Sequence, residues 1–169
     1  MIETKIIERE VFIQNKDEGS RFYNNGYGIW CEQGLKLSLV EALYLVEKGE
    51  IVIKDENDKT LTLKDIVNLF SKMDKKFWLK YSIYNDLKKR GFNVKPGFSE
   101  EEIEFLMGEG GKKFSFNYIV IGLEEGVKLD FNSLTQMVDE ALRSQKELIL
   151  AIIDKEGNIS YYTVTKLIR

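Results

Sequence analysis

Hydrophobic and polar positions along this 169-residue chain follow two periods, one typical of short strands and one of amphipathic helices. Strands are expected where β-branched and aromatic residues cluster, and helices where apolar residues recur every three or four positions. The predicted strands cover residues 6–13, 51–53, 92–95, 114–121, 148–153 and 159–164. The predicted helices cover residues 38–49, 62–70, 75–90 and 133–144. This order predicts a chain of alternating small α/β elements.

Local signals mark where these elements begin and end. Ser38 and Glu41 have the spacing of a capping box at the start of a helix, and Gly49 suits its left-handed end. Polar and glycine-rich stretches between the periodic segments predict turns or loops. These are a turn-rich segment at 15–20, an aromatic and glycine-interrupted loop at 22–30, a turn at 55–58 and an irregular or mobile excursion at 99–111.

The element order predicts an α/β (α+β) fold in two units. It reads strand, helix, strand, helix, and then helix, two strands, helix, two strands. The boundary is expected near residues 73–80. We therefore expect an N-terminal α/β domain at residues 1–76 and a C-terminal domain at residues 77–169.

Composition narrows the class of protein. The net charge of −3 and the pI near 5.3 argue against a protein that binds nucleic acid by itself through one basic face. Cys31 is the single cysteine, so an internal disulfide is excluded and a reducing compartment is expected. No window approaches the roughly 20 apolar residues of a membrane span. A cytoplasmic protein without a membrane partner is the expectation.

The chain contains no histidine, which restricts its chemistry. Histidine is the side chain best matched to proton transfer near neutral pH, whereas tyrosine and lysine titrate near pH 10. The acidic segment at 100–104 is local in sequence and predicts a solvated surface rather than a metal site. No metal and no cofactor are expected. A nuclease that uses Tyr118 or Tyr161 with Lys146 remains an alternative.

Two further segments permit both a structural and a functional interpretation. Lys88, Lys89 and Arg90 close a predicted helix, where its dipole favours cations, and they could also contact RNA phosphates within an assembly. The last predicted strand, residues 159–164, carries aromatic or β-branched residues on both faces. Such a strand is either buried within its own domain or paired with another subunit.

Three segments, in this order, resemble archaeal tRNA-splicing endonucleases. They are YNNGYGIWCEQGLKLSLVEALYLVEKGEIVI, KYSIYNDLKKRGFNVKPGF and AIIDKEGNISYYTV. The first is similar to the family's N-terminal domain, the second to the entry into its catalytic domain, and the third to its closing hairpin. The resemblance implies that the C-terminal domain has a restriction-endonuclease-like mixed sheet. It also implies metal-independent cleavage of precursor tRNA at intron boundaries, which leaves a 2′,3′-cyclic phosphate and a 5′-hydroxyl.

The resemblance also implies a catalytic tyrosine, histidine and lysine, and this chain departs from that triad. The tyrosine position falls near Met107, and the histidine position falls on Ser115. Lys146 fits the lysine position and is a candidate remnant of the site. With two of three groups absent, the isolated chain is not expected to cut RNA by the family mechanism.

Assembly features of the family have counterparts at the end of this chain. The resemblance implies four units that join through paired terminal strands and through an acidic hairpin loop that docks into a basic pocket of another subunit. The corresponding interface residues here are Asp154, Glu156, Ile159, Tyr161, Tyr162 and Val164. We therefore expect a structural subunit of a heterotetramer, whose partners are a homologous catalytic subunit and, through the complex, precursor tRNA. The alternative is a homo-oligomeric RNA-binding or assembly protein on the same fold, without a catalytic partner.

Overall fold

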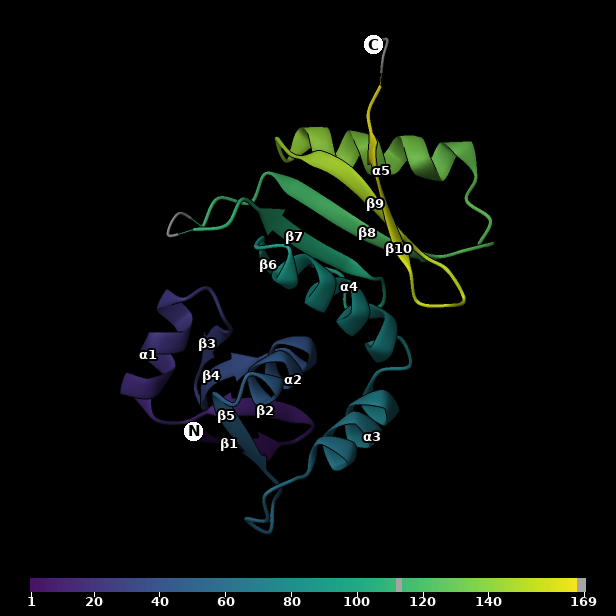
Figure 1. Cartoon of the computed structure of the whole chain (residues 1–169). Helices are drawn as coiled ribbons and strands as arrows, with labels where there is room; N and C mark the ends of the chain where they lie inside the picture. The colour runs from purple at the N-terminus through teal and green to yellow at the C-terminus, as the bar shows by residue number, and fades with distance from the viewer. Residues whose placement is uncertain (112–113, 167–169) are drawn as a thin grey trace. The chain divides into compact units, whose positions relative to one another are not determined.

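The chain folds into two compact units, Met1–Trp78 and Leu79–Arg169, in a computed structural model that describes residues 1–111 and 114–166 (Figure 1). The described residues form five helices and two five-stranded sheets, which confirms the predicted α+β class. The strands are β1 Ile2–Ile7, β2 Glu10–Ile13, β3 Ile29–Cys31, β4 Gly34–Leu37, β5 Ile51–Lys54, β6 Asn93–Pro96, β7 Glu104–Gly108, β8 Tyr118–Glu124, β9 Glu147–Ile153 and β10 Ile159–Val164. The helices are α1 Lys16–Asn24, α2 Leu39–Glu47, α3 Leu63–Met73, α4 Phe77–Lys89 and α5 Phe131–Arg143.

The sheet of the first unit has the strand order β3-β4-β2-β1-β5. β5 pairs with β1 in parallel, and the other neighbours are antiparallel. The prediction of one strand over residues 6–13 was wrong, because the chain reverses at Glu8 and Arg9. Both residues have positive φ angles, 48° and 69°, which match a tight hairpin turn.

The segment predicted as a turn and a packed loop forms a helix and a strand instead. α1 begins after Asn15, whose side chain accepts hydrogen bonds from the backbone N–H groups of Asp17 and Glu18. An asparagine in a polar run therefore acts as a helix cap, not as a turn residue. Within this segment, Phe22 is buried and gives the short helix an apolar contact. β3 and β4, which were not predicted, follow as a second hairpin.

The cap predicted at Ser38 is confirmed, because Ser38 and Glu41 form the capping box of α2. Thr62 and Asp65 form the same kind of box at α3. Glu41 is a buried carboxylate whose oxygens accept from Ser38 and from the backbone N–H of Gly28, so its charge is compensated by hydrogen bonds. The cap therefore also holds the preceding loop in place.

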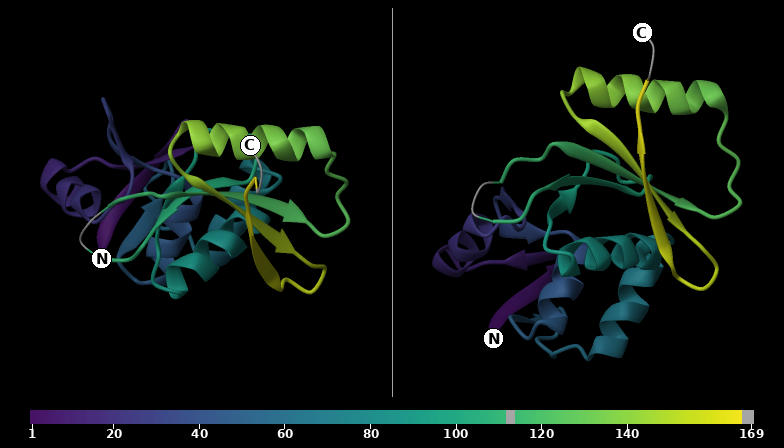
Figure 2. Two further views of the ribbon diagram at one scale, coloured as in Figure 1. Left: turned by 90° about the horizontal axis from the view of Figure 1, so that it is seen from above. Right: turned by 45° about the horizontal axis from the view of Figure 1, so that its top comes forward.

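The sheet of the second unit has the order β10-β9-β8-β7-β6. β8 and β9 run parallel, and the other neighbours are antiparallel. α4 and α5 lie on opposite faces of this sheet (Figures 1 and 2). On the α4 face, Gly122 of β8 leaves room for Ile83, since a β-carbon at Gly122 would lie 2.6 Å from its methyl group. On the α5 face, Val138 and Ala141 pack with Leu148 and Leu150.

The segment 99–111, predicted as an irregular excursion, contains β7, an internal strand of the second sheet. β7 pairs with both β6 and β8, and Phe105, Leu106 and Met107 are buried. The acidic and glycine-rich flanks hid this three-residue apolar run from pattern reasoning. Among the described helices, none is long and apolar enough to cross a membrane.

Candidate functional site

The closing hairpin of the second unit is built by β9, the loop 154–158 and β10. The carboxylate of Asp154 accepts hydrogen bonds from the backbone N–H groups of Glu156 and Asn158, at 2.9 and 2.8 Å. It also accepts a bond of 3.1 Å from the Asn158 side chain. The bonds from Asn158 and the further backbone bonds hold the pKa of Asp154 below its ordinary value. Asp154 therefore shapes the loop, and the exposed Glu156 is the acidic side chain it presents.

β10 is an edge strand, and its predicted interface residues divide between the two sheet faces. Ile159 and Tyr161 lie on the α4 face, where Tyr161 pairs with Ala151. Tyr162 and Val164 lie on the α5 face. Val164 packs against the apolar cluster under α5, whereas Tyr162 is 54% exposed. Tyr162 is thus the largest apolar surface that β10 presents to solvent.

Tyr161 joins β10 to α4 through a polar cluster with Asp86 and Arg90. The Tyr161 hydroxyl donates to Asp86 Oδ2 at 2.6 Å, and Arg90 Nε donates to the same oxygen at 2.9 Å. The Arg90 guanidinium also lies 5.2 Å from the centroid of the Tyr161 ring. Burial, together with the bond to Asp86, raises the pKa of the Tyr161 phenol. Sequence reasoning missed Asp86, although its i,i+4 spacing to Arg90 was a usable signal.

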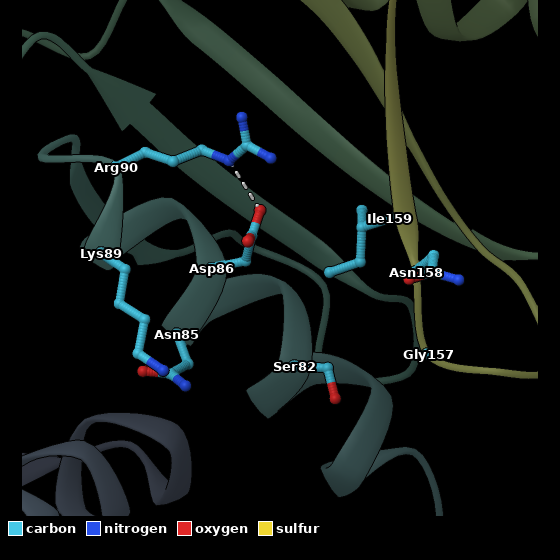
Figure 3. Close-up of a pocket in the computed structure, with 8 residues that line it drawn as sticks. All are labelled: Ser82, Asn85, Asp86, Lys89, Arg90, Gly157, Asn158 and Ile159. Atoms are coloured by element: carbon cyan, nitrogen blue, oxygen red, sulfur yellow. Dashed lines mark hydrogen bonds and ion pairs between the residues drawn. The ribbon is translucent and has the colours of Figure 1, made fainter.

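A polar pocket lies beside this cluster, between the second half of α4 and the start of β10 (Figure 3). Its lining residues are Ser82, Asn85, Asp86, Lys89, Arg90, Gly157, Asn158 and Ile159. Of the three cations predicted to contact RNA, Lys89 and Arg90 line this pocket and Lys88 does not. Arg90 is already paired with Asp86.

The three residues at the expected catalytic positions lie near one end of the second sheet. Because β8 and β9 are parallel, the segment before β8 and the residue before β9 are adjacent, and Glu147 N–H donates to Asn117 O at 2.9 Å. Ser115 is exposed and donates from Oγ to Asn117 Oδ1 at 3.1 Å. Lys146 is half-buried and donates from Nζ to the carbonyl oxygen of Phe116. The structure therefore brings Ser115 and Lys146 into one region.

Met107 is buried in β7 and is not the residue that meets the Ser115 segment. It pairs with Tyr118 and Val94, and its side chain lies on the α4 face. The next residue, Gly108, lies against Ser115: a β-carbon there would be 1.7 Å from the Ser115 carbonyl oxygen. Position 108 therefore has no room for a side chain.

Tyr161 and Lys146 cannot act as one catalytic pair. Tyr161 is opposite Ala151, which lies five residues beyond Lys146 along β9. At about 3.3 Å for each residue of a strand, the two positions are about 16 Å apart. The raised pKa of Tyr161 further disfavours its phenolate at neutral pH.

The chain matches known proteins along most of its length. The family described as tRNA intron endonuclease, N-terminal domain, matches residues 2–67, and its catalytic C-terminal domain matches residues 77–161. A tRNA-splicing endonuclease of Methanococcus vannielii is 32% identical over 165 residues, which cover 96% of this chain and 93% of that protein. One of Thermococcus kodakarensis is 36% identical over 155 residues, or 91% of each chain. One of Methanococcoides burtonii is 32% identical over 163 residues, which cover 96% of this chain but 46% of that longer protein. The chain belongs to the tRNA intron endonuclease family.

Proposed function

We propose that this chain is the non-catalytic structural subunit of a heterotetrameric tRNA-splicing endonuclease. The observation that carries the proposal is the absence of histidine from all 169 residues. The partner is a homologous chain that supplies the catalytic tyrosine, histidine and lysine. The complex cuts precursor tRNA at both intron boundaries, and this chain sets the spacing of the catalytic subunits.

The chemistry of the reaction explains why the missing imidazole is decisive. Metal-independent cleavage needs a base for the 2′-hydroxyl and an acid for the leaving 5′-oxygen, so that a 2′,3′-cyclic phosphate and a 5′-hydroxyl result. The serine hydroxyl at position 115 does not titrate near neutral pH, and the thioether of Met107 carries no proton. Lys146 supplies a positive charge but cannot by itself serve as both base and acid.

Two features of the hairpin support a role in assembly. β10 is an edge strand with an exposed Tyr162, and unprotected edges of this kind favour pairing with another strand. The loop 154–158 presents Glu156 on a backbone held by Asp154. An acidic group on a rigid loop is suited to select a basic partner, because charge complementarity governs specificity more than affinity.

A cleavage assay in EDTA tests the proposal. The purified chain should leave a bulge-helix-bulge precursor tRNA intact, and adding the homologous catalytic chain should produce both cuts. Cleavage by the purified chain alone would overturn the non-catalytic role. The mass and composition of the assembly that copurifies with a tagged copy of this chain provide a second test. An assembly of this chain alone would favour the homo-oligomeric alternative.

A further inference from the structure

Two aromatic side chains lie together on the surface of the first unit, where α1 packs beside the hairpin of β3 and β4 (Figure 1). Tyr23 of α1 and Trp30 of β3 have ring centroids 6.1 Å apart and an interplanar angle of 47°. Tyr23 is 49% exposed and Trp30 is 37% exposed. Neither the Tyr23 hydroxyl nor the Trp30 indole N–H forms a hydrogen bond with the residues that the structure describes. We refer to Tyr23 and Trp30 as the aromatic pair.

The sequence places a glycine in α1 beneath the Trp30 side chain. A β-carbon at Gly19 would lie 2.8 Å from Cη2 of Trp30 and 3.3 Å from the β-carbon of Leu35. Glycine destabilises a helix relative to alanine, and α1 has only nine residues. Burial of Trp30 does not explain this loss, because the side chain stays more than a third exposed. The helix therefore gives up local stability to hold an indole at the surface, which is typical of a functional site.

A lysine lies on the same face of α1 as the aromatic pair. Lys16 shares this face with Gly19 and Tyr23, because residues three and seven apart lie on one side of a helix. By the same spacing, Asp17 and Glu18 lie off this face. Lys16 is exposed and forms no ion pair within residues 1–111 and 114–166. The surface thus combines two exposed rings, two polar groups that can hydrogen-bond a ligand, and one cation.

An unpaired RNA base is the ligand that matches this surface. Unstacked bases of single-stranded RNA stack on aromatic side chains, and their edges donate and accept hydrogen bonds. The neighbouring phosphate supplies an anion for a lysine. The core of a protein interface is instead depleted in charged residues and needs a wider apolar surface. Ile29, the exposed aliphatic neighbour of Trp30, does not widen this surface, since adjacent residues of a strand point to opposite faces.

We propose that Trp30, Tyr23 and Lys16 hold an unpaired nucleotide of RNA on the first unit. The inference rests on the proposed function, since it takes this RNA to be the precursor tRNA. The base stacks on Trp30 beside Tyr23, and Lys16 contacts a phosphate of the same strand. Because every base has a π face, the site adds affinity for single-stranded segments and little preference for their sequence. The chain then holds the substrate as well as spacing the catalytic subunits.

RNA binding by variants of the aromatic pair tests the site. Trp30→Leu removes the ring but keeps an apolar group over Gly19, and Trp30→Phe keeps a ring at this position. Lys16→Gln removes the charge alone. Trp78→Leu is the matched control, because Trp78 is a second exposed tryptophan of the same unit and lies outside the pair.

Each variant is made in the tagged full-length chain and purified with the subunits that accompany it. Circular dichroism and sedimentation check that it folds and assembles. The probes are a precursor tRNA with 2′-deoxy nucleotides at the cleavage sites and a fully paired RNA duplex of equal length, both in EDTA and at several salt concentrations.

We expect Trp30→Leu to bind the precursor tRNA roughly tenfold more weakly, the size of one lost base–aromatic stack. Trp30→Phe should keep most of the affinity, and Trp78→Leu should keep all of it. Lys16→Gln should make the slope of log K against log salt shallower by about 1. Binding of the duplex should be the same for all variants of Trp30, because a duplex offers no unpaired base.

Equal binding of precursor tRNA by Trp30→Leu and the original chain would overturn the inference and leave the structural-subunit role intact. Loss of the accompanying subunits from a folded Trp30→Leu variant would also overturn it, since the pair would then belong to a protein interface. An original chain that recruits no catalytic subunit would refute the proposed function alone. The lone Trp78→Phe chain, in which Trp30 is the only tryptophan, then decides about the site. Single-stranded RNA should quench its fluorescence, and unchanged fluorescence would refute the site.

Discussion

Each unit contains a five-residue loop that begins with aspartate, and the two loops close with the same hydrogen bonds. In loop 55–59 the leading N–H donates to the carbonyl of the fifth residue at 3.0 Å, and in loop 154–158 the same bond is also 3.0 Å. In both loops the leading carboxylate accepts from the N–H groups of the third and fifth residues. A leading aspartate therefore produces the same turn in two different sequences, DENDK and DKEGN.

The two loops are followed by different structures. After loop 55–59, Leu61 N–H donates to Ile53 O at 2.8 Å, and Thr62 then caps α3. This short return covers part of the outer edge of β5. After loop 154–158, the chain continues as β10, in which five of six residues are aromatic or β-branched, and this strand becomes a new edge. The turn is thus set by the aspartate, and the residues that follow decide whether a sheet edge is covered or exposed.

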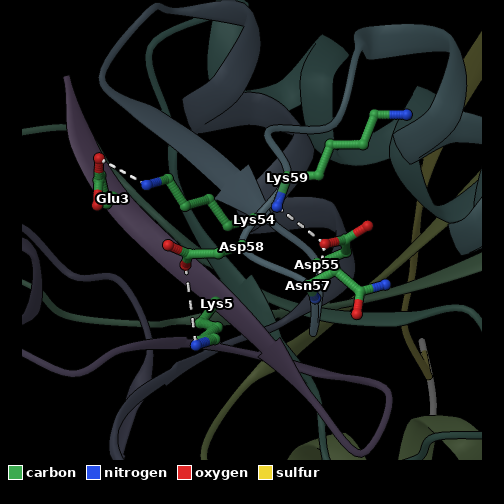
Figure 4. Close-up of polar contacts among 7 residues, drawn as sticks. All are labelled: Glu3, Lys5, Lys54, Asp55, Asn57, Asp58 and Lys59. Atoms are coloured by element: carbon green, nitrogen blue, oxygen red, sulfur yellow. Dashed lines mark hydrogen bonds and ion pairs between the residues drawn. The ribbon is translucent and has the colours of Figure 1, made fainter.

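The two loops also differ in how their charges are compensated. In the first unit, Lys5 Nζ lies 3.9 Å from Asp58 Oδ1, and Lys54 Nζ lies 2.9 Å from Glu3 Oε1 (Figure 4). In the second unit, Glu156 forms no ion pair with the described residues. Glu56 of loop 55–59 likewise forms no ion pair with the described residues, so the two loops differ in the pairing of Asp58.

The largest expected effect comes from blocking the exposed edge. Opposite residues of the hairpin alternate between hydrogen-bonded and non-hydrogen-bonded pairs, and the bond from Asp154 N–H to Asn158 O marks a hydrogen-bonded pair. In this register Thr163 belongs to a non-hydrogen-bonded pair, so its N–H points away from β9. Thr163→Pro removes this outward donor and no bond within the sheet. We expect the assembly to dissociate while the chain stays folded. Sedimentation and circular dichroism measure the two properties.

Thr163→Ser is the matched control, because it changes the same side chain and keeps the N–H. It should assemble like the original chain. If the proline variant keeps the full mass of the assembly, β10 does not pair with another subunit.

The elements with strong local signals could be predicted from the sequence, and those without them could not. The capping boxes at Ser38 and Thr62 and the alternation of the last hairpin each depend on a few neighbouring residues. α1 was missed because its cap, Asn15, also suits a turn. β7 was missed because its three apolar side chains are flanked by acidic and glycine-rich segments, and its strand character comes from pairing with β6 and β8.

The candidate site, too, could be predicted from the sequence only in part. The absence of histidine is a property of the sequence, and the neighbourhood of Ser115 and Lys146 could be anticipated from the family resemblance. The contact of Lys95 with Phe116 depends on the register of three strands, β6, β7 and β8, and no spacing along the chain indicates it. The position of Gly108 against Ser115 likewise requires the pairing of β7 with β8.

An intermediate effect is expected from reversing the charge of the docking loop. Glu156→Lys should lower the mass of the assembly without lowering the melting temperature of the chain, since Glu156 uses its backbone, and not its side chain, to close the loop. Sedimentation at two salt concentrations measures the change. Glu56→Lys, the same change of charge in loop 55–59, is the control and should leave the mass unchanged. Equal losses for both variants would show that overall charge, and not this loop, governs assembly.

The smallest expected effect is on stability, and it comes from substitutions at the fourth residue of each loop. Gly157 has a φ of 88° and Asp58 a φ of 65°, both in the left-handed region. A β-carbon at Gly157 would meet no atom within 4 Å, so Gly157→Ala changes backbone strain alone and should destabilise the chain by about 1 kcal/mol. Asp58→Gly relieves such strain but increases the entropy of the unfolded chain, and these contributions should nearly cancel.

Thermal unfolding of the two variants measures this difference. The melting temperature should fall for Gly157→Ala and stay almost unchanged for Asp58→Gly. A neutral Gly157→Ala variant would mean that the loop at 154–158 relaxes out of this turn in solution, and a relaxed loop could not present Glu156 in one fixed position.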